Sequence, residues 1–210
     1  MLGKILDCCV PNVNRKEIND LIRNEAFHYI EPRHQSDFID KMWDIGKAIR
    51  ESKYINISYQ RTGDRKTVER KVMPVSLMFS EYYFYITAFI DDEKVKESFD
   101  ILDDPFPTIY RIDRIKKYKI TEEHYRIPYA NRFEEGEFRK RIQFMQGGKL
   151  QKVRFTYSGP SVEAVLDRLP TAVIENEKND TYTISAEVFG KGIEMWLRSQ
   201  GDFVKVLEMR

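Results

Sequence analysis

Basic and aromatic side chains alternate over residues 70–115, and this stretch carries the strongest indication of a ligand. Arg70 comes first, the sequence FYI follows at residues 84–86, and YRIDRI closes the stretch at residues 110–115. Guanidinium groups form forked hydrogen bonds to phosphate or carboxylate, and aromatic rings stack on bases. The chemistry that these residue types offer is the binding of an anion that carries a ring.

Arg111 and Arg114 are the first candidates for contact with such a ligand. Arg114 also has a structural explanation, because it could pair with Asp113 or with an acid of residues 91–104, and a surface ion pair of that kind contributes little to stability. For Arg111, ligand contact is favoured over a surface ion pair. For Arg70, the two roles stay open.

The aromatic residues divide by the face on which they lie. In an alternating strand, Tyr85 points away from Phe84 and Ile86 and shares its face with polar side chains, so its ring could stack on a ligand or be half-buried structure. Phe84 and Ile86 are predicted to be buried. Trp43 and Trp196 each fall in an apolar helical stripe, which predicts that both belong to the core.

Length and composition limit the class of protein. The chain has 210 residues, 41% of them hydrophobic, and a formal net charge of +1, so an anion site must come from local clustering of charge. No apolar run approaches the ~20 residues of a membrane span, and no signal peptide is recognisable at the N-terminus. We expect a cytoplasmic protein that does not contact a membrane.

The sequence contains no constellation that predicts catalysis or a cofactor. Its three histidines, His28, His34 and His124, have no partner at ligand spacing, and the adjacent Cys8 and Cys9 match no metal-binding pattern. The sequence GKG at residues 190–192 lacks the spacing of a phosphate-binding loop. We therefore expect a protein that is not an enzyme and holds neither a metal nor another cofactor.

Periodicity predicts an α+β fold. Apolar residues at helical spacing predict helices over residues 15–28 and 36–51, the second capped by Ser36, and alternation then predicts about five short antiparallel strands, a number suited to a small barrel. Pro74 lies within one of these strands, which predicts a sheet edge or a bulge. Residues 142–210 follow the order strand, helix, strand, strand, helix, strand, typical of a ferredoxin-like domain. The predicted segments are a helical segment (1–52), a barrel (53–121), a linker (122–141) and a C-terminal α/β domain (142–210).

The central motifs resemble those of the WYL domain, a family found in bacterial transcription regulators. FYI at residues 84–86 stands at the Trp-Tyr-Leu strand of the family, ten residues after Pro74, Arg70 stands at the arginine before that proline, and YRIDRI matches the closing motif. The similarity extends over about residues 38–207, the last part resembling the extension that commonly follows a WYL domain. It implies an Sm-like or SH3-like barrel that senses single-stranded DNA or another anionic effector. The residues that it implicates are Tyr59, Arg70, Tyr85, Arg111 and Arg114, with Arg61 as a weaker candidate.

Two departures from the family pattern limit what the resemblance implies. Thr108 stands where many members carry another arginine, which thins the basic cluster. The residues before Ser36 hold one clear helix, too little for the helix-turn-helix that usually begins such regulators, so this chain is not expected to read a promoter through a major-groove helix.

Two functions are carried forward. The first is a non-enzymatic, effector-sensing regulator that binds single-stranded nucleic acid or a nucleotide-like anion. The second is an interaction module that acts through a partner complex, in which the arginines pair with protein carboxylates. A homodimer is expected from the family and from the aromatic-rich strands. A nucleic-acid enzyme is the least favoured reading, because no catalytic constellation is present.

Overall fold

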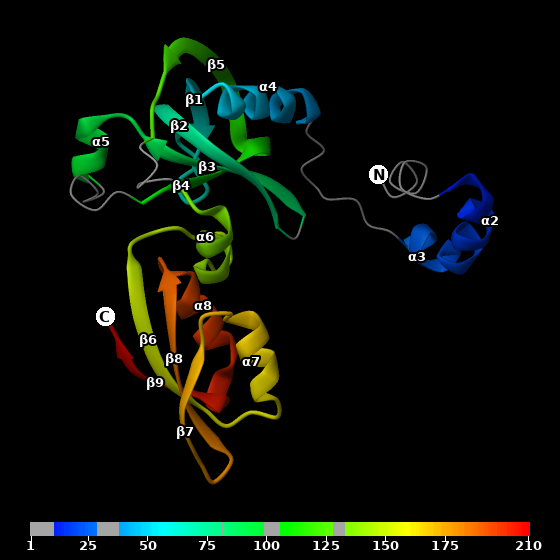
Figure 1. The fold of residues 1–210 in the computed structure, drawn as a ribbon, viewed down its shortest axis with the longest axis vertical. Helices are drawn as coiled ribbons and strands as arrows, with labels where there is room; N and C mark the ends of the chain where they lie inside the picture. The colour runs from blue at the N-terminus through cyan, green and yellow to red at the C-terminus, as the bar shows by residue number, and fades with distance from the viewer. Residues whose placement is uncertain (1–10, 29–37, 81, 99–105, 128–132) are drawn as a thin grey trace. The chain divides into compact units, whose positions relative to one another are not determined.

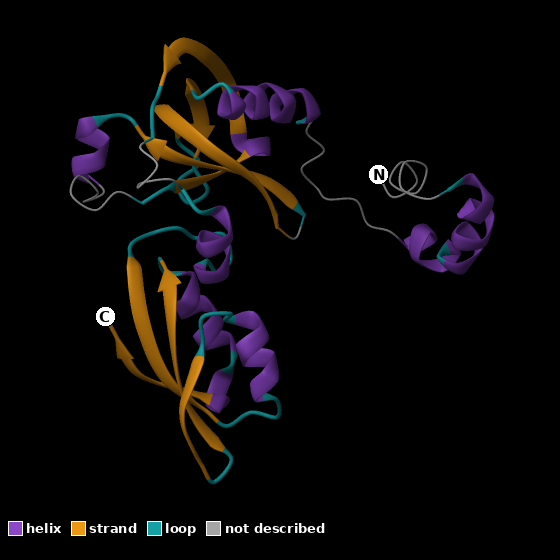
Figure 2. Cartoon of the chain, viewed as in Figure 1, coloured by secondary structure: helices purple, strands orange, loops and turns teal. Residues whose placement is uncertain are grey.

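Two antiparallel sheets with helices dominate the computed structural model, which describes residues 11–28, 38–80, 82–98, 106–127 and 133–210 (Figures 1 and 2). The chain divides into two compact units, residues 1–37 and residues 38–210. Helices and antiparallel sheets share the second unit, which confirms the predicted mixture. None of the helices in the described part of the chain is long and apolar enough to cross a membrane.

The first unit contains two short helices where the sequence predicts one over residues 15–28. Helix α2 (Asn12–Leu21) and helix α3 (Arg23–His28) are separated at Ile22, whose φ of −98° and ψ of 10° depart from helical values. Leu21 is 77% exposed although it belongs to the predicted apolar stripe. Ser36, the predicted cap of the next helix, lies outside the described residues.

The first sheet of the second unit has five strands in the order β4-β3-β2-β1-β5. Helix α5 (Glu93–Ser98) precedes β4, and the 3-10 turn η1 (Ile112–Arg114) joins β4 to β5. A closed barrel needs its two edge strands to pair, and the described residues show no pairing between β4 and β5. The strand number is confirmed, whereas the closed barrel is not. The strands are β1 (Lys53–Gln60), β2 (Thr67–Ser80), β3 (Tyr83–Ile90), β4 (Thr108–Arg111) and β5 (Ile115–His124).

Helix α4 (Ile39–Arg50) lies against this sheet and closes its core. Ile45 and Ala48 are buried against residues of β1, β2 and β3. Trp43, which the sequence predicts in the core, is 75% exposed. Residues two apart on a helix differ by about 200° in direction, so a helix that buries Ile45 turns Trp43 toward solvent.

The β2–β3 hairpin carries one confirmed prediction and one correction. The pairing of β2 with β3 shifts register between Pro74 and Ser76, which is the bulge that the proline predicts. Phe84, predicted to be buried, is only half-buried. Its ring lies 4.8 Å from that of Phe79, which is itself 53% exposed, because the two residues pair close to the turn of the hairpin, at the end of the sheet. Ile86 is fully buried, as predicted.

The C-terminal sheet has the predicted strand–helix–strand–strand–helix–strand order and the strand order β7-β8-β6-β9. Figure 1 shows α7 and α8 together on one face of it. Trp196 is 7% exposed and packs on Phe155 at 5.9 Å between ring centres, so its predicted core position is confirmed. The elements are β6 (Leu150–Tyr157), α7 (Val162–Arg168), β7 (Val173–Lys178), β8 (Thr181–Phe189), α8 (Gly192–Ser199), η3 (Gly201–Phe203) and β9 (Val204–Met209).

Helix α6 (Glu135–Arg141) supplies the packing between the two sheets. Its Phe138 is 3% exposed and lies in a small core with Met78 of β2 and Ile142. Phe189 of β8 packs on the same cluster, with its ring 5.1 Å from that of Phe138. This core holds the segment that follows α6 beside the first sheet.

Replacing Phe138 tests how much this small core contributes. We expect Phe138→Ala to lower the free energy of unfolding by about 3 to 5 kcal/mol, because it removes a buried ring and leaves a cavity. Trp43→Ala removes an exposed ring and should change it by no more than about 0.5 kcal/mol. Urea unfolding of both variants measures the difference. A loss at Trp43 as large as that at Phe138 would contradict the packing described above.

Candidate anion-binding site

A cavity of about 510 Å³ lies where β1, β3 and β4 meet the segment that follows α6. Three of the six residues predicted from the sequence line it, namely Tyr59, Tyr85 and Arg111. The pairing of β3 with β4 sets Tyr85 directly opposite Arg111, which brings the two side chains together. The remaining lining residues are Thr62, Phe106, Pro107, Thr108, Ile109, Phe144, Met145, Gln146 and Gly147.

Tyr59 forms the buried end of this wall. It is 9% exposed, and its ring stands edge-on to that of Tyr110 at 4.9 Å. The backbone N–H of Arg111 donates to the Tyr59 hydroxyl oxygen at 3.4 Å. Burial raises the pKa of Tyr59, and the amide of Arg111 and the charge of Arg114 offset part of that rise. The hydroxyl therefore keeps its proton at neutral pH, and that proton can be donated to a ligand.

Arg111 is held in place by two interactions. Its Nη2 and Nε contact the two carboxylate oxygens of Asp113 at 2.7 and 3.1 Å, and its Cζ lies 3.5 Å from the centre of the Tyr83 ring. Burial lowers the pKa of Arg111, but hydrogen bonding and charge from Asp113 outweigh it, and the pKa is raised overall. The partner that the sequence offered to Arg114 thus belongs to Arg111.

Arg114 and Arg70 do not line the cavity. The Nε of Arg114 is buried without a hydrogen-bond partner among the described residues, and its charge lies close enough to Tyr59 to act on the pKa of that hydroxyl. Arg70 acts in the same way on Tyr110, whose pKa burial raises to about 12. Both arginines add positive electrostatic potential near Tyr59 and Tyr110.

Arg61, the weakest candidate, lies outside this arrangement. It pairs with Asp64 at 3.6 Å in the β1–β2 turn, and both side chains are well exposed. Its neighbour Thr62 lines the cavity instead. The sequence alternation continues through this turn, but a turn redirects side chains, so alternation alone could not place Arg61.

Two groups of site residues were missed by reading the sequence. The first is Tyr83, whose ring packs against the guanidinium of Arg111. Tyr83 and Tyr85 are two positions apart in the strand and so share a face, and this spacing could have identified Tyr83. The opposite wall comes from the segment 144–147, far along the chain. Phe144 and Met145 adopt left-handed φ values of 51° and 52°, a conformation that bulky side chains rarely take and that often accompanies function. Gly147 fits because a side chain there would meet the carbonyl oxygen of Pro107 at 3.0 Å.

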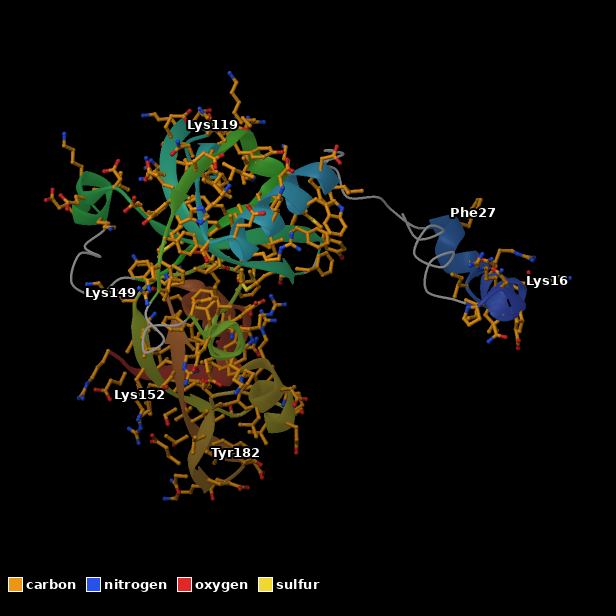
Figure 3. The ribbon with its side chains drawn as sticks, turned by 45° about the horizontal axis from the view of Figure 1, so that its top comes forward. Lys16, Phe27, Lys119, Lys149, Lys152 and Tyr182 are labelled. Atoms are coloured by element: carbon orange, nitrogen blue, oxygen red, sulfur yellow. The ribbon has the colours of Figure 1, made fainter. Side chains whose placement is uncertain are left out.

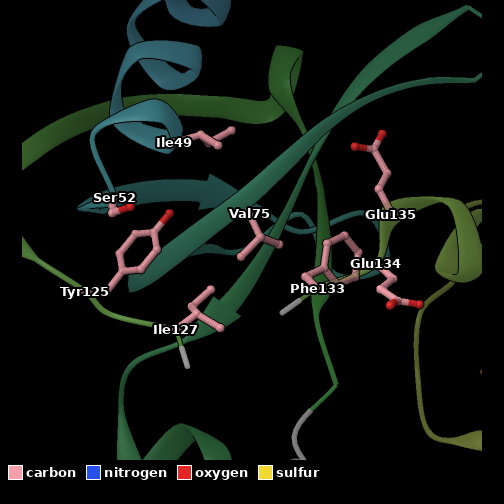
Figure 4. Close-up of a pocket in the computed structure, with 8 residues that line it drawn as sticks. All are labelled: Ile49, Ser52, Val75, Tyr125, Ile127, Phe133, Glu134 and Glu135. Atoms are coloured by element: carbon pink, nitrogen blue, oxygen red, sulfur yellow. The ribbon is translucent and has the colours of Figure 1, made fainter. Parts of the chain in front are cut away.

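A larger cavity of about 840 Å³ lies beside Val75 and Tyr125 (Figure 4). Its walls include Phe133 and the two carboxylates of Glu134 and Glu135. Like charges repel at such a surface, so this cavity does not suit an anion. Within the part of the chain described, no three side chains of His, Cys, Asp or Glu are grouped to hold a metal ion.

Lysines are spread over the outside of both sheets. Figure 3 shows Lys119 of β5 and Lys152 of β6 extending outward from their sheets. Arg111 differs from these lysines, because neighbouring side chains hold its guanidinium in the cavity, whereas the lysines are exposed to solvent.

Part of the chain matches a known protein family. Residues 41–120 match the WYL domain family. The match covers less than half of the chain. All six residues predicted from the sequence lie within the matched range, and so does FYI at residues 84–86.

Two solved structures are similar to the chain. Proteasome accessory factor B/C of Arthrobacter aurescens aligns with 14% identity and a TM-score of 0.41, over 85% of this chain and 26% of that one. A CRISPR Cas-related protein aligns with 16% identity and a TM-score of 0.49, over 81% of this chain and 48% of that one. The chain thus spans less than half the length of either structure. No curated protein matches it.

The Arg111–Asp113 pair can be tested by its effect on stability. A double-mutant cycle with Arg111→Ala and Asp113→Asn should give a coupling of roughly 1 to 2 kcal/mol, because the contact is bidentate and the side chains are 20% and 10% exposed. The exposed pair of Arg61 and Asp64 is the matched control and should couple by less than about 0.5 kcal/mol. Urea unfolding provides both values, and equal couplings would show that Arg111 is not held as described.

Proposed function

We propose that this chain is a non-enzymatic regulatory protein of the transcription-regulator type, whose WYL domain binds single-stranded nucleic acid or a nucleotide-like anion. The observation that carries the proposal is the grouping of Tyr59, Tyr85 and Arg111 on one wall of a cavity. The wall combines a guanidinium, a protonated hydroxyl and a half-buried aromatic ring. These groups suit a phosphate, its ester oxygen and a base or other ring.

Each residue has a defined part in this binding. Arg111 is already oriented by Asp113 and Tyr83, so little side-chain entropy is lost when a phosphate approaches its free N–H groups. Tyr59 donates its hydroxyl proton to a ligand oxygen. The ring of Tyr85 lies opposite Arg111 across the strand pair and stacks on the base that follows the phosphate.

Affinity should be moderate and dependent on salt. Stacking on an aromatic side chain contributes about 1 to 3 kcal/mol per base. Phosphate contacts release counterions, so the logarithm of the binding constant falls with the logarithm of salt concentration, with a slope of about −0.7 per contact on a single strand. The charges of Arg70 and Arg114 strengthen this dependence, while the acidic residue Asp113 opposes it.

A fluorescence titration with labelled single-stranded oligothymidylate tests the proposal. We expect binding at low salt, and we expect Arg111→Ala to weaken it about tenfold or more, because the guanidinium contact with phosphate is lost. Arg198→Ala, on the exposed side of α8, is the matched control and should bind as the native chain does. No binding at low salt, or equal binding by the two variants, would refute the proposal.

The pH dependence follows from the direction of the Tyr59 shift. The ordinary pKa of tyrosine is 10.0, and that of Tyr59 is raised above it, so its hydroxyl stays protonated up to pH 9. Affinity for oligothymidylate should be constant from pH 7 to 9 and fall only above pH 10, where a phenolate would repel phosphate. Tyr59→Phe, which lacks the donor, should bind more weakly throughout. A steady loss of affinity of the native chain between pH 7 and 9 would contradict this role.

A second candidate, a docking or dimerisation module, is favoured by the exposed face of α4. Ile39 and Trp43, four residues apart on one helical face, are 58% and 75% exposed. If a second copy covers this face, light scattering at micromolar concentration should show a dimer, and Trp43→Glu should give a monomer. If a partner complex covers it, a pull-down should retain that partner after nuclease treatment. A monomeric native chain that retains no partner would exclude this candidate.

A further inference from the structure

A further cavity, of about 320 Å³ and here named the second cavity, shares Phe144 and Met145 with the cavity of Tyr59, Tyr85 and Arg111, the first cavity. Those two residues line both cavities, so they form a shared wall. The remaining lining residues of the second cavity are Ser80, Arg139, Lys140, Ile142, Gln143, Arg168 and Pro170. Because they share Phe144 and Met145, the two cavities adjoin each other.

Two guanidinium groups line the second cavity without a carboxylate partner among the described residues. Arg139 donates to the carbonyl oxygen of Phe79 at 2.9 Å and contacts the sulfur of Met145. The Cζ of Arg168 lies 5.0 Å from the centre of the Phe144 ring. Lys140 differs, because Glu137 neutralises it at 2.6 Å. The N–H groups of the two arginines that these contacts do not use remain available to an anion.

Phe144 lines both cavities, and Arg168 lies over its ring. It is 39% exposed although its side chain is large and apolar, and its backbone is held at a left-handed φ of 51°. Buried Gln143 anchors the segment, since its amide donates to the carbonyl oxygen of Arg168 at 3.3 Å. An exposed ring on a fixed backbone is a platform on which a base can stack.

We propose that the two cavities form one binding track for single-stranded nucleic acid. The strand leaves the first cavity at Arg111, stacks a base on Phe144 and places its next phosphate between Arg139 and Arg168. This inference rests on the function proposed above and narrows it. The ligand is an oligonucleotide with at least two phosphate groups, and a mononucleotide occupies only the first cavity.

The alternation of groups favours nucleic acid over an acidic peptide. A single strand repeats phosphate, base and phosphate, and the track repeats guanidinium, ring and guanidinium. An acidic peptide would use the arginines but would leave the exposed Phe144 ring without a partner of its own kind. The two ligands therefore differ in whether binding depends on the ring.

The decisive experiment compares a long and a short ligand on the full chain. The affinity for labelled oligothymidylate of ten nucleotides is measured by fluorescence titration, and the affinity for thymidine 5′-monophosphate is measured by calorimetry. We expect the double variant Arg139→Ala with Arg168→Ala to bind the oligonucleotide at least tenfold more weakly, with a salt slope smaller by about 0.7 for each lost contact. Its affinity for the monophosphate should be unchanged. Arg198→Ala controls for the loss of an arginine from the same domain.

The platform is tested by substituting Phe144. We expect Phe144→Ala to weaken oligonucleotide binding by at least fivefold and Phe144→Tyr to restore it, because tyrosine keeps the stacking surface. Circular dichroism and thermal unfolding of each variant establish that it is folded. Because Phe144 also lines the first cavity, the monophosphate control is read on the double arginine variant and not on the Phe144 variants.

The outcomes separate this inference from the proposed function. If Arg111→Ala abolishes oligonucleotide binding while the double variant binds as the native chain does, the first cavity stands and the track is refuted. If the native chain binds neither ligand, both proposals fail. If a polyglutamate peptide binds as tightly as the oligonucleotide and does so equally well with Phe144→Ala, the assignment to nucleic acid is overturned.

Discussion

The packing of Phe138 between the two sheets is the constraint on which the candidate site depends. Phe138 and Ile142 fill the space between Met78 of the first sheet and Phe189 of the second. Because these apolar groups are removed from water together, the segment after α6 lies against β4, and its backbone closes the cavity opposite Tyr59. Without this contact, Tyr59 and Tyr85 would lie on an open sheet surface and would not line a cavity.

The positive potential of the first cavity depends on how the surrounding fold positions Arg111. The net charge of the chain is +1, so the positive potential of the cavity is local. Arg111 is the only one of the predicted arginines that lines it, and its position depends on Asp113, an acid that also lowers the local potential. Asp113 weakens the attraction between the cavity and an anion, but it fixes the orientation of the Arg111 guanidinium. This favours a ligand whose phosphate fits the free edge of that guanidinium.

Local patterning predicted much of the fold, and it failed where distant contacts decided the outcome. Alternation located the strands, and Pro74 located a bulge, because both are properties of neighbouring residues. Trp43 was misplaced because an apolar stripe has two possible edges, and only packing against the sheet selects Ile45 for burial. Barrel closure depends on pairing between strands far apart in sequence, which a strand count does not fix.

The sequence by itself determined the residue types of the candidate site, the number of strands in the first sheet and the order of strands and helices along residues 142–210. The tertiary structure decided which arginine pairs with Asp113, and that Tyr59, Tyr85 and Arg111 share a cavity while Arg61 does not. It also brought Phe144 beside them. The physical reason is that strand pairing and burial act between residues far apart in the chain, whereas periodicity reports only the direction of each side chain relative to its neighbours.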